Sequence, residues 1–309
     1  MRIAFLNKYQ NKVFRGAETF VYELSKRLSE NHQVEIISDV NYLELLKKRY
    51  DVIIPTNGRW QVIIVRKIAW LTRAKMVVSG QSGIGWDDRV NLYTFPDAFI
   101  ALSSKALKWA KRVNPFVKSV YIPNGVDLTR FKIGDYRLKN EIKTILCVGA
   151  ATEQKRLDLV IKAVAKLDRV KLIIACGGGE LQKEIRDYGL KILGDRFQMV
   201  SVPFEKMPDI YRAADVFTLP SASSEAFGNV LVEAMATNLP VVATDDPIRH
   251  EILGDAGILV DPADEEAYAK ALQKALDNNW GDRPRKQAEK FSWDGIAKKY
   301  EEVFKKFSK

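Results

Sequence analysis

Short apolar runs alternate with amphipathic stretches along the whole chain, and this alternation constrains the fold more than any other feature. The first run, 2–6, is predicted to be a strand; a loop through Gly16 follows, and then an amphipathic helix at about 18–29. Later runs predict strands at 34–38, 52–55, 76–79 and 98–102, with a short basic helix at 42–49. Strands that alternate with helices in this way are typical of parallel sheets covered by helices.

The same pattern starts again after a polar stretch at 133–143. Strands are predicted at 145–148, 171–175, 197–200, 216–219, 241–243 and 258–260, and helices at 157–166, 181–190, 265–278 and 293–306. Two doubly wound α/β units joined near 130–143 explain this repetition most economically. We therefore predict domains at 1–135 and 136–290, followed by a terminal helical segment at 291–309.

Composition places the chain among ordinary globular proteins. It is 47% hydrophobic and 28% charged, and no window reaches the roughly 18 apolar residues of a membrane-spanning helix. The opening residues, 1–7, turn polar too early for a secretory signal, so a cytoplasmic protein is expected. Cys147 and Cys176 lie in apolar runs and are predicted to be reduced core residues. His32 and His250 match no metal-ligand spacing, and no metal site is proposed.

The positive charge is confined to the first half of the chain. Residues 1–130 contain 21 Lys and Arg against 11 Asp and Glu, whereas residues 131–309 contain 28 of each. A basic surface of this kind indicates either an anionic partner or a charge that only maintains solubility.

Two glycine-containing segments lie where a ligand could approach the backbone. The segment Arg15-Gly16-Ala17-Glu18 precedes a predicted helix, and its glycine either admits a sugar or phosphate or only permits a turn. Gly177, Gly178 and Gly179 follow a predicted strand. They do not form the Gly-x-Gly-x-x-Gly fingerprint, so a nicotinamide cofactor is disfavoured.

The segment from Glu225 to Glu233 is far more specific. A strand is predicted to end at Leu219, and a helix to begin near Gly228, so that backbone N–H groups and the helix dipole would favour a diphosphate. Vicinal sugar hydroxyls match carboxylate oxygens well, so one glutamate could bind a sugar and the other a ribose. The alternative is a solvated glutamate, but Glu233 stands among Val-Leu-Val and Ala-Met-Ala, where an unpaired charge is costly.

This segment closely resembles the Glu-x7-Glu motif of the retaining glycosyltransferases of family 4. Gly16-Ala17-Glu18 resembles the N-terminal glycine loop of that family. Further stretches that match in the family's order are 122–127 (IPNGVD) with Phe131, 148–149 (VG) with 155–158 (KRLD), 240–244 (PVVAT), 257–262 (GILVDP) and 291–293 (FSW). The resemblance covers nearly the whole chain.

The resemblance implies a GT-B fold of two Rossmann-like domains that face a central cleft. The first domain would bind the acceptor and the second the donor, and the last helix would cross back onto the first. Glu233 would bind the ribose, Glu225 would face the transferred sugar, and Lys155 would neutralise the diphosphate, so neither a metal nor a cofactor is expected. Other residues implied for the donor are Phe227, Gly228, Asn229, Val230, Gly177, Gly178, Arg156 and Gly16, with Val202 and Pro203 beside the base.

Two positions depart from the family pattern. Ala150 stands where the family commonly has an arginine, so one diphosphate cation is missing, and Arg156 is the candidate to replace it. Gln81 stands where the family often has a histidine near the sugar, and a glutamine binds a hydroxyl but carries no proton. We include Gln81 with Glu225 and Lys155 among the candidate catalytic residues. Asp87 and Asp88, in the same stretch, are expected in a solvated turn.

The predicted function is retaining transfer of a sugar from a UDP- or GDP-linked donor. One alternative is a degenerate member that binds a sugar nucleotide or a partner chain without transfer. Another is a sugar-nucleotide epimerase or a phosphorylase of the same two-domain shape. Nucleic acid is disfavoured as a partner because the chain lacks recognition motifs.

The basic first half gives a candidate site for the acceptor. It could hold the enzyme peripherally at the anionic inner face of the cell membrane, where a lipid-linked or cell-envelope glycan would be the acceptor. Residues 59–70 mix cations, aromatics and aliphatics as an interfacial segment does. A partly buried core helix with snorkelling cations fits the same residues.

Overall fold

The computed structural model describes residues 1–10, 16–134, 142–222 and 225–307. The chain forms two compact units: Met1–Gly125 together with Phe291–Lys309, and Val126–Lys290. Each contains one parallel six-stranded sheet, so the predicted α/β class is confirmed. The predicted boundary at residue 135 stays a prediction, because it lies outside the described residues.

The sheet of the first unit has the strand order β2-β1-β3-β4-β5-β6, and every neighbouring pair is parallel. Buried aliphatic residues form its central strands, as is typical of a sheet covered on both faces. The strands are β1 (Arg2–Leu6), β2 (Gln33–Ile37), β3 (Val52–Pro55), β4 (Lys75–Ser79), β5 (Ala98–Ala101) and β6 (Ser119–Tyr121).

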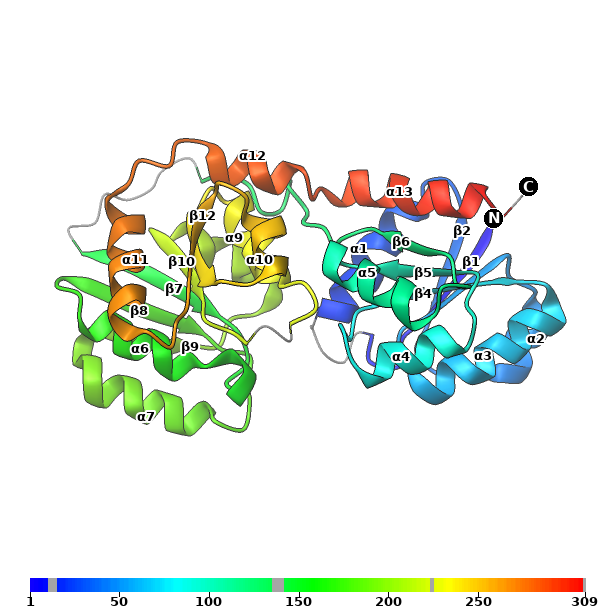
Figure 1. The fold of residues 1–309 in the computed structure, drawn as a ribbon, viewed down its shortest axis with the longest axis horizontal. Helices are drawn as coiled ribbons and strands as arrows, with labels where there is room; N and C mark the ends of the chain where they lie inside the picture. The colour runs from blue at the N-terminus through cyan, green and yellow to red at the C-terminus, as the bar shows by residue number, and fades with distance from the viewer. Residues whose placement is uncertain (11–15, 135–141, 223–224, 308–309) are drawn as a thin grey trace. The chain divides into compact units, whose positions relative to one another are not determined.

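Helices cover both faces of this sheet (Figure 1). One face packs against α1 (Gly16–Leu28) and α13 (Trp293–Lys305), with Phe20, Trp293 and Tyr300 in a shared aromatic cluster. The other face packs against the remaining four helices. These are α2 (Tyr42–Lys48), α3 (Arg59–Thr72), α4 (Trp86–Tyr93) and α5 (Ser104–Val113).

The sheet of the second unit has the order β12-β11-β10-β7-β8-β9, and all its pairs are parallel. The chain crosses over between β9 and β10, so the carboxyl ends of β7 and β10 lie side by side, which is where open α/β sheets bind ligands. The strands are β7 (Lys143–Val148), β8 (Val170–Ala175), β9 (Phe197–Val200), β10 (Val216–Leu219), β11 (Val241–Thr244) and β12 (Gly257–Val260).

Two layers of helices enclose the second sheet. A buried apolar cluster joins one face to α6 (Leu157–Ala165), α7 (Gln182–Leu193) and α11 (Glu265–Asp277). Helix α9 (Asn229–Ala236) packs on β10 and β11 at the other face. Beside it lie α8 (Met207–Arg212), α10 (Pro247–Leu253) and α12 (Arg283–Glu289).

The structure corrects one local prediction and adds one strand. Residues 86–93 form α4 rather than a solvated turn, and Asp88 is only 2% exposed. Gly80 lets this carboxylate approach the loop after β4, because a Cβ at Gly80 would lie 2.9 Å from Asp88 Oδ2. The short strand β6 was not predicted.

Two further predictions concern the interior and the helices. Cys147 and Cys176 are buried and unpaired, as predicted, and burial raises the pKa of the Cys147 thiol to about 12. Within the described part of the chain, none of the helices is long and apolar enough to cross a bilayer.

Candidate functional site

Loops at the carboxyl ends of four adjacent strands of the second unit contain most of the predicted site residues. Lys155 belongs to the short 3₁₀ helix η1 (Glu153–Lys155) after β7, and Glu225 to the loop between β10 and α9. The parallel pairing of β7 with β10 brings these two loops together, and Ala222 N–H donates to the Gln154 carbonyl at 2.8 Å.

Lys155 and Glu225 form an ion pair. Lys155 Nζ lies 2.6 Å from Glu225 Oε1, and each side chain is 22% exposed. The lysine stem lies over Gly149, where a Cβ would come within 3.3 Å of Lys155 Cδ. Burial opposes the charged form of Glu225, but Lys155, Ser221 and Arg249 outweigh this effect, so the pKa of Glu225 lies below its usual range.

A buried arginine that no sequence motif indicated holds the other side of this carboxylate. Arg249, in α10, is 2% exposed, and its Nη2 lies 3.3 Å from Glu225 Oε2. The same nitrogen donates to Ser221 Oγ at 2.5 Å, while Nη1 pairs with Asp246, the N-cap residue of α10. Ser221 in turn donates to Glu225 Oε2 at 2.5 Å. The ionised Glu225 is therefore fixed from both sides.

Arg156 holds the loop after β10 rather than presenting a free cation. Its Nε donates to the Pro220 carbonyl at 2.8 Å, and its Nη2 reaches the Ser221 carbonyl and the Thr244 hydroxyl at 3.3 and 3.2 Å. These bonds engage the guanidinium with protein oxygens. Its predicted role beside a diphosphate stays a prediction.

The N-terminus of α9 has the geometry of an anion site. Gly228 takes a left-handed conformation (φ 94°) as the N-cap residue, which a side chain would strain. Asn229 and Val230 form the first turn, where the helix dipole favours negative charge, and Phe227 is buried before it. The loop between β10 and α9 thus combines Glu225 with a helix N-terminus.

Glu233 is half-buried, and it has a hydrogen-bond partner that its apolar neighbours in the sequence did not indicate. The hydroxyl of Tyr211, in α8, donates to Glu233 Oε2 at 2.8 Å. Tyr211 is fully buried and packs edge-on against Phe131, at 5.8 Å between ring centres. Burial, together with the adjacent Glu233 carboxylate, raises the pKa of the Tyr211 hydroxyl, so the tyrosine stays protonated as a donor.

The glycine segment after β8 packs against the loop after β7. Ala151 N–H donates to the Gly178 carbonyl at 2.7 Å, and a Cβ at Gly179 would lie 2.3 Å from the Ala151 carbonyl oxygen. Gly177 is exposed, and a Cβ there would contact nothing within 4 Å. Close backbone packing therefore explains Gly179, while Gly177 and Gly178 stay predicted nucleotide contacts.

The segment after β9 is held by Arg130. The guanidinium of Arg130 lies 3.6 Å from the centre of the Phe204 ring and also binds the Phe204 carbonyl. This contact fixes the backbone next to Val202 and Pro203, where the family resemblance implies the nucleotide base. Asp127 fixes Arg130 in turn, because its Oδ1 accepts the backbone N–H of Arg130 at 3.1 Å.

Two predicted residues belong to the first unit. Gly16 is the first residue of α1. Gln81 follows β4, and its amide exchanges two hydrogen bonds with Asn124, at 2.9 and 3.0 Å, and donates to Ser79 Oγ at 2.9 Å. Both parts of the Gln81 amide therefore have protein partners.

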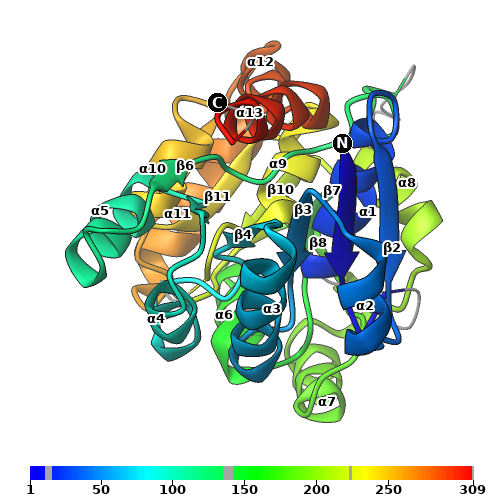
Figure 2. The ribbon, with the colours of Figure 1, turned by 90° about the vertical axis from the view of Figure 1, so that its right-hand side faces the viewer.

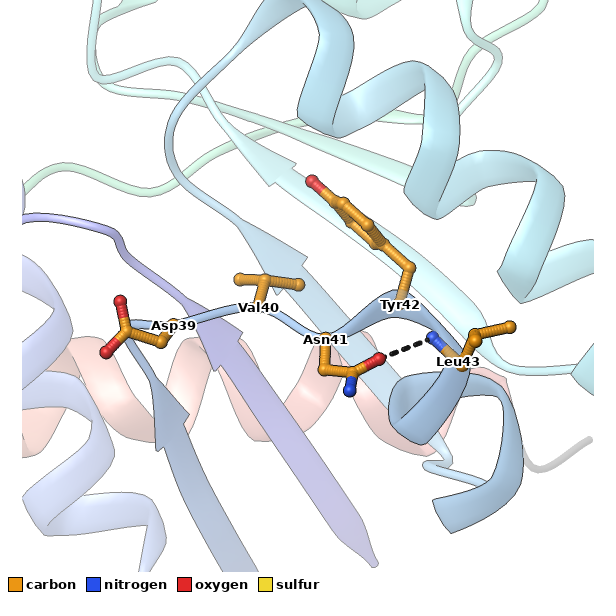
Figure 3. A pocket seen from close by; sticks show the side chains of 5 residues that line it. All are labelled: Asp39, Val40, Asn41, Tyr42 and Leu43. Atoms are coloured by element: carbon orange, nitrogen blue, oxygen red, sulfur yellow. Dashed lines mark hydrogen bonds between the residues drawn. The ribbon is translucent and has the colours of Figure 1, made fainter.

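A separate hollow in the first unit contains none of the predicted residues. It is lined by five consecutive residues between β2 and the first turn of α2 (Figure 3). Asn41 there is the N-cap residue of α2, since its Oδ1 accepts the Leu43 N–H at 3.0 Å. We assign it no function.

Comparison with known proteins places this arrangement in a family context. A family model described as glycosyl transferases group 1 matches residues 129–292. The uncharacterized glycosyltransferase MJ1607 of Methanocaldococcus jannaschii is 33% identical over 186 residues, which cover 54% of this chain and 46% of that protein. The phosphatidyl-myo-inositol mannosyltransferase of Mycolicibacterium smegmatis is 30% identical over 225 residues, covering 68% and 57%. The chain spans about half the length of these curated relatives.

Solved structures share the whole fold at low sequence identity. Anabaena HepE in complex with UDP and glucose superimposes with a TM-score of 0.84 and 17% identity, and the match covers 99% of each chain. Sucrose-phosphate synthase from Thermosynechococcus elongatus gives a TM-score of 0.78 and 19% identity. These similarities confirm the predicted GT-B class of two Rossmann-like units.

Proposed function

Because the chain belongs to the glycosyl transferases group 1 family, we propose that it transfers a sugar from a nucleoside-diphosphate donor to an acceptor. The donor is UDP- or GDP-linked, and the anomeric configuration is retained. The observation that supports this most directly is the Lys155–Glu225 ion pair beside the N-terminus of α9. A cation beside a helix N-terminus at one edge of a sheet suits a diphosphate, and a fixed carboxylate suits a sugar hydroxyl.

In this proposal Lys155 exchanges partners when the donor binds. Its Nζ moves from Glu225 Oε1 to a diphosphate oxygen, while Ser221 and Arg249 keep the carboxylate in place through Oε2. As the bond from the anomeric carbon to the diphosphate breaks, Lys155 and the α9 N–H groups stabilise the charge that develops on the leaving group. The acceptor oxygen bonds to the anomeric carbon from the same face, and its proton passes to the departing diphosphate oxygen. Glu233, oriented by Tyr211, binds the ribose diol.

The decisive test is calorimetry with a panel of nucleoside diphosphates, beside a donor-hydrolysis and transfer assay with the matching sugars. UDP comes first in the panel, because the structural neighbour HepE binds it. Lys155→Ala should weaken nucleotide binding, and Glu225→Ala should reduce turnover while nucleotide binding is retained. Unchanged turnover in both variants would refute the site assignment. Analysis of the product anomer by NMR tests retention.

Activity should be independent of metal ions, because Lys155 supplies the positive charge. Turnover in the presence of a chelator should match that of the untreated enzyme. A loss restored by a divalent cation would overturn this part of the proposal.

A second candidate function is donor binding without transfer. Ala150 and Gln81 favour it, since both lack a charge that the family commonly has, and the Gln81 amide is engaged by Asn124 and Ser79. Nucleotide binding with no hydrolysis or transfer of any donor sugar would support this candidate over the enzyme.

For the acceptor we propose a lipid-linked or cell-envelope glycan. Relatives include the phosphatidyl-myo-inositol mannosyltransferase above and an O-antigen chain mannosyltransferase of Salmonella typhimurium. The basic first unit would then meet the inner face of the cell membrane peripherally. Transfer to extracted membrane lipids, compared with transfer to soluble sugars, tests the acceptor class.

A further inference from the structure

Helix α3 is apolar on two opposite faces. Its inner face, which includes Val62, Val65 and Ile68, is buried in the core. On its outer face, however, Trp60, Trp70 and Leu71 are 76%, 81% and 73% exposed. A helix that is apolar all round is normally buried. The sequence left open whether 59–70 is an interfacial segment or a partly buried core helix. The structure shows that one face of this helix belongs to the core and that the other face, with the two tryptophans, is exposed.

Neighbouring helices extend this apolar character. Helix α4 packs against both α3 and α5 (Figure 2). Arg59 Nε lies 2.5 Å from Asp87 Oδ1, which joins the first turns of α3 and α4 and brings Trp60 and Trp86 to the same end of the two helices. We define the aromatic surface as the exposed residues Trp60, Ile64, Trp70, Leu71, Ile84, Trp86, Tyr93, Phe95 and Phe116.

Basic residues predominate on these three helices and the loops between them. Residues 59–118 contain eleven Lys and Arg and only three acidic residues. Asp87 pairs with Arg59, Asp97 pairs with Arg66 and Lys75, and Asp88 is 2% exposed. Cations that remain exposed are Lys67, Arg73, Arg89, Lys105, Lys108, Lys111, Arg112 and Lys118.

We propose that the aromatic surface docks onto an anionic lipid bilayer. Tryptophan side chains favour the headgroup level of a membrane, and each exposed lysine or arginine adds attraction to anionic lipid. Together the two terms give reversible binding without a membrane-spanning helix. A protein partner fits less well, because lysines are depleted from protein interfaces. The purpose of docking rests on the proposed lipid-linked acceptor. Docking itself can be tested separately from transfer, because the aromatic surface contains no predicted donor-site residue.

Flotation of the full chain with vesicles tests the proposal. The vesicles are phosphatidylcholine alone, or phosphatidylcholine with about 30% phosphatidylglycerol, at low and high salt. The wild type should float with the anionic vesicles, less so at high salt, and its tryptophan emission should shift to shorter wavelength. Trp60→Ser with Trp70→Ser should reduce binding at least about tenfold, and Lys67→Glu at least about fivefold.

Matched controls separate docking from misfolding and from net charge. Tyr22→Ser removes an exposed aromatic on α1, at the opposite face of the sheet, and Lys183→Glu makes the same charge change on α7 of the second unit. Both should bind as the wild type does. Equal binding to neutral vesicles, unchanged binding of the Trp60/Trp70 variant, or a tryptophan-dependent dimer in ultracentrifugation would each overturn the proposal. Nucleotide calorimetry on the same variants reports the donor site separately, so failure of docking and failure of the proposed transfer are distinguishable.

Discussion

At the scale of single residues, Arg249 is expected to position Glu225. Among the residues that the structure describes, Arg249→Met leaves Glu225 Oε2 with Ser221 as its hydrogen-bond partner, so we expect turnover to fall about 10–100-fold. Arg249→Lys should recover only part of the turnover. It restores the positive charge, but an ammonium cannot bridge Asp246 and Glu225 as the guanidinium does. Because Arg249 helps to lower the pKa of Glu225, the acid limb of the pH–rate profile should move to higher pH in Arg249→Met.

The control for this prediction is Arg285, another arginine of the second unit. It donates to the carbonyls of Phe131 and Ala236, at 2.9 and 2.7 Å. Arg285→Met should therefore lower stability and leave the pH profile of the folded enzyme in place. An unshifted acid limb in Arg249→Met would show that Arg249 is only structural.

Asp88 makes the stability of the first unit depend on pH. Burial, and to a lesser extent Asp87, raises the pKa of Asp88 to about 7, whereas in the unfolded chain it is about 3.9. Between these values the folded protein keeps a proton that the unfolded chain has lost, so the free energy of unfolding falls as pH rises. Asp88→Asn should be more stable than the wild type by at least about 1 kcal/mol at pH 8, and should match it near pH 4.

Urea denaturation at the two pH values measures this effect. The comparison variant is Asp87→Asn, which removes an exposed ion pair with Arg59 and only a minor cause of the raised Asp88 pKa, so its gain at pH 8 should be much smaller than that of Asp88→Asn. A constant difference between Asp88→Asn and the wild type at both pH values would contradict the assignment.

At the scale of elements, the loops after β7 and β8 act as one piece because of Gly179. This residue has φ +127°, and a Cβ there would lie 2.3 Å from the Ala151 carbonyl oxygen. Gly179→Ala should therefore cost about 1–3 kcal/mol of stability in urea denaturation. Gly177→Ala, in open space, should change stability by less than about 0.5 kcal/mol. Equal losses of stability in Gly179→Ala and Gly177→Ala would mean that the two loops can move apart without an energetic penalty.

Sequence patterns predicted the elements well wherever apolar runs were continuous. The strand at Arg2–Leu6 is observed at the predicted residues, because buried parallel strands are uninterrupted apolar runs. Helix α4 was missed because Asp87 and Asp88 are typical turn residues. Its stability depends on Gly80, eight positions away, which makes room for the Asp88 carboxylate.

The candidate site was predictable only in part. Lys155 and Glu225 were selected through motifs, and the pairing of β7 with β10 brings them together. Arg249 and Tyr211 were not, because they lie 24 and 22 residues from the glutamates they contact, in helices with no recognisable motif. Such contacts follow from the order of strands and helices in space, which local patterns do not encode.

At the scale of the whole molecule, the end of the chain completes the core of the first unit. Trp293 is 1% exposed and lies against Gly125, where a Cβ would be 2.8 Å from Trp293 Cδ2. Ile296, Tyr300 and Phe304 continue the contact along α13. The first unit is therefore built from both ends of the sequence, whereas the predicted donor residues other than Gly16 lie in the second.

This division predicts separable stabilities. Trp293→Ala should lower the free energy of unfolding of the first unit by about 3–5 kcal/mol, because the tryptophan is fully buried. Its thermal transition should fall accordingly, and nucleotide affinity should stay unchanged. Leu272→Ala, at a fully buried position of α11, should lower the free energy of unfolding of the second unit by about 2–5 kcal/mol, and with it the thermal transition of that unit. Calorimetric scans with and without a nucleoside diphosphate measure both, since the ligand raises only the transition of the unit that binds it. Full rescue of Trp293→Ala by the ligand, or one transition that shifts equally in both variants, would show that the two units unfold as a single cooperative body. The assignment of donor binding to the second unit alone would then fail.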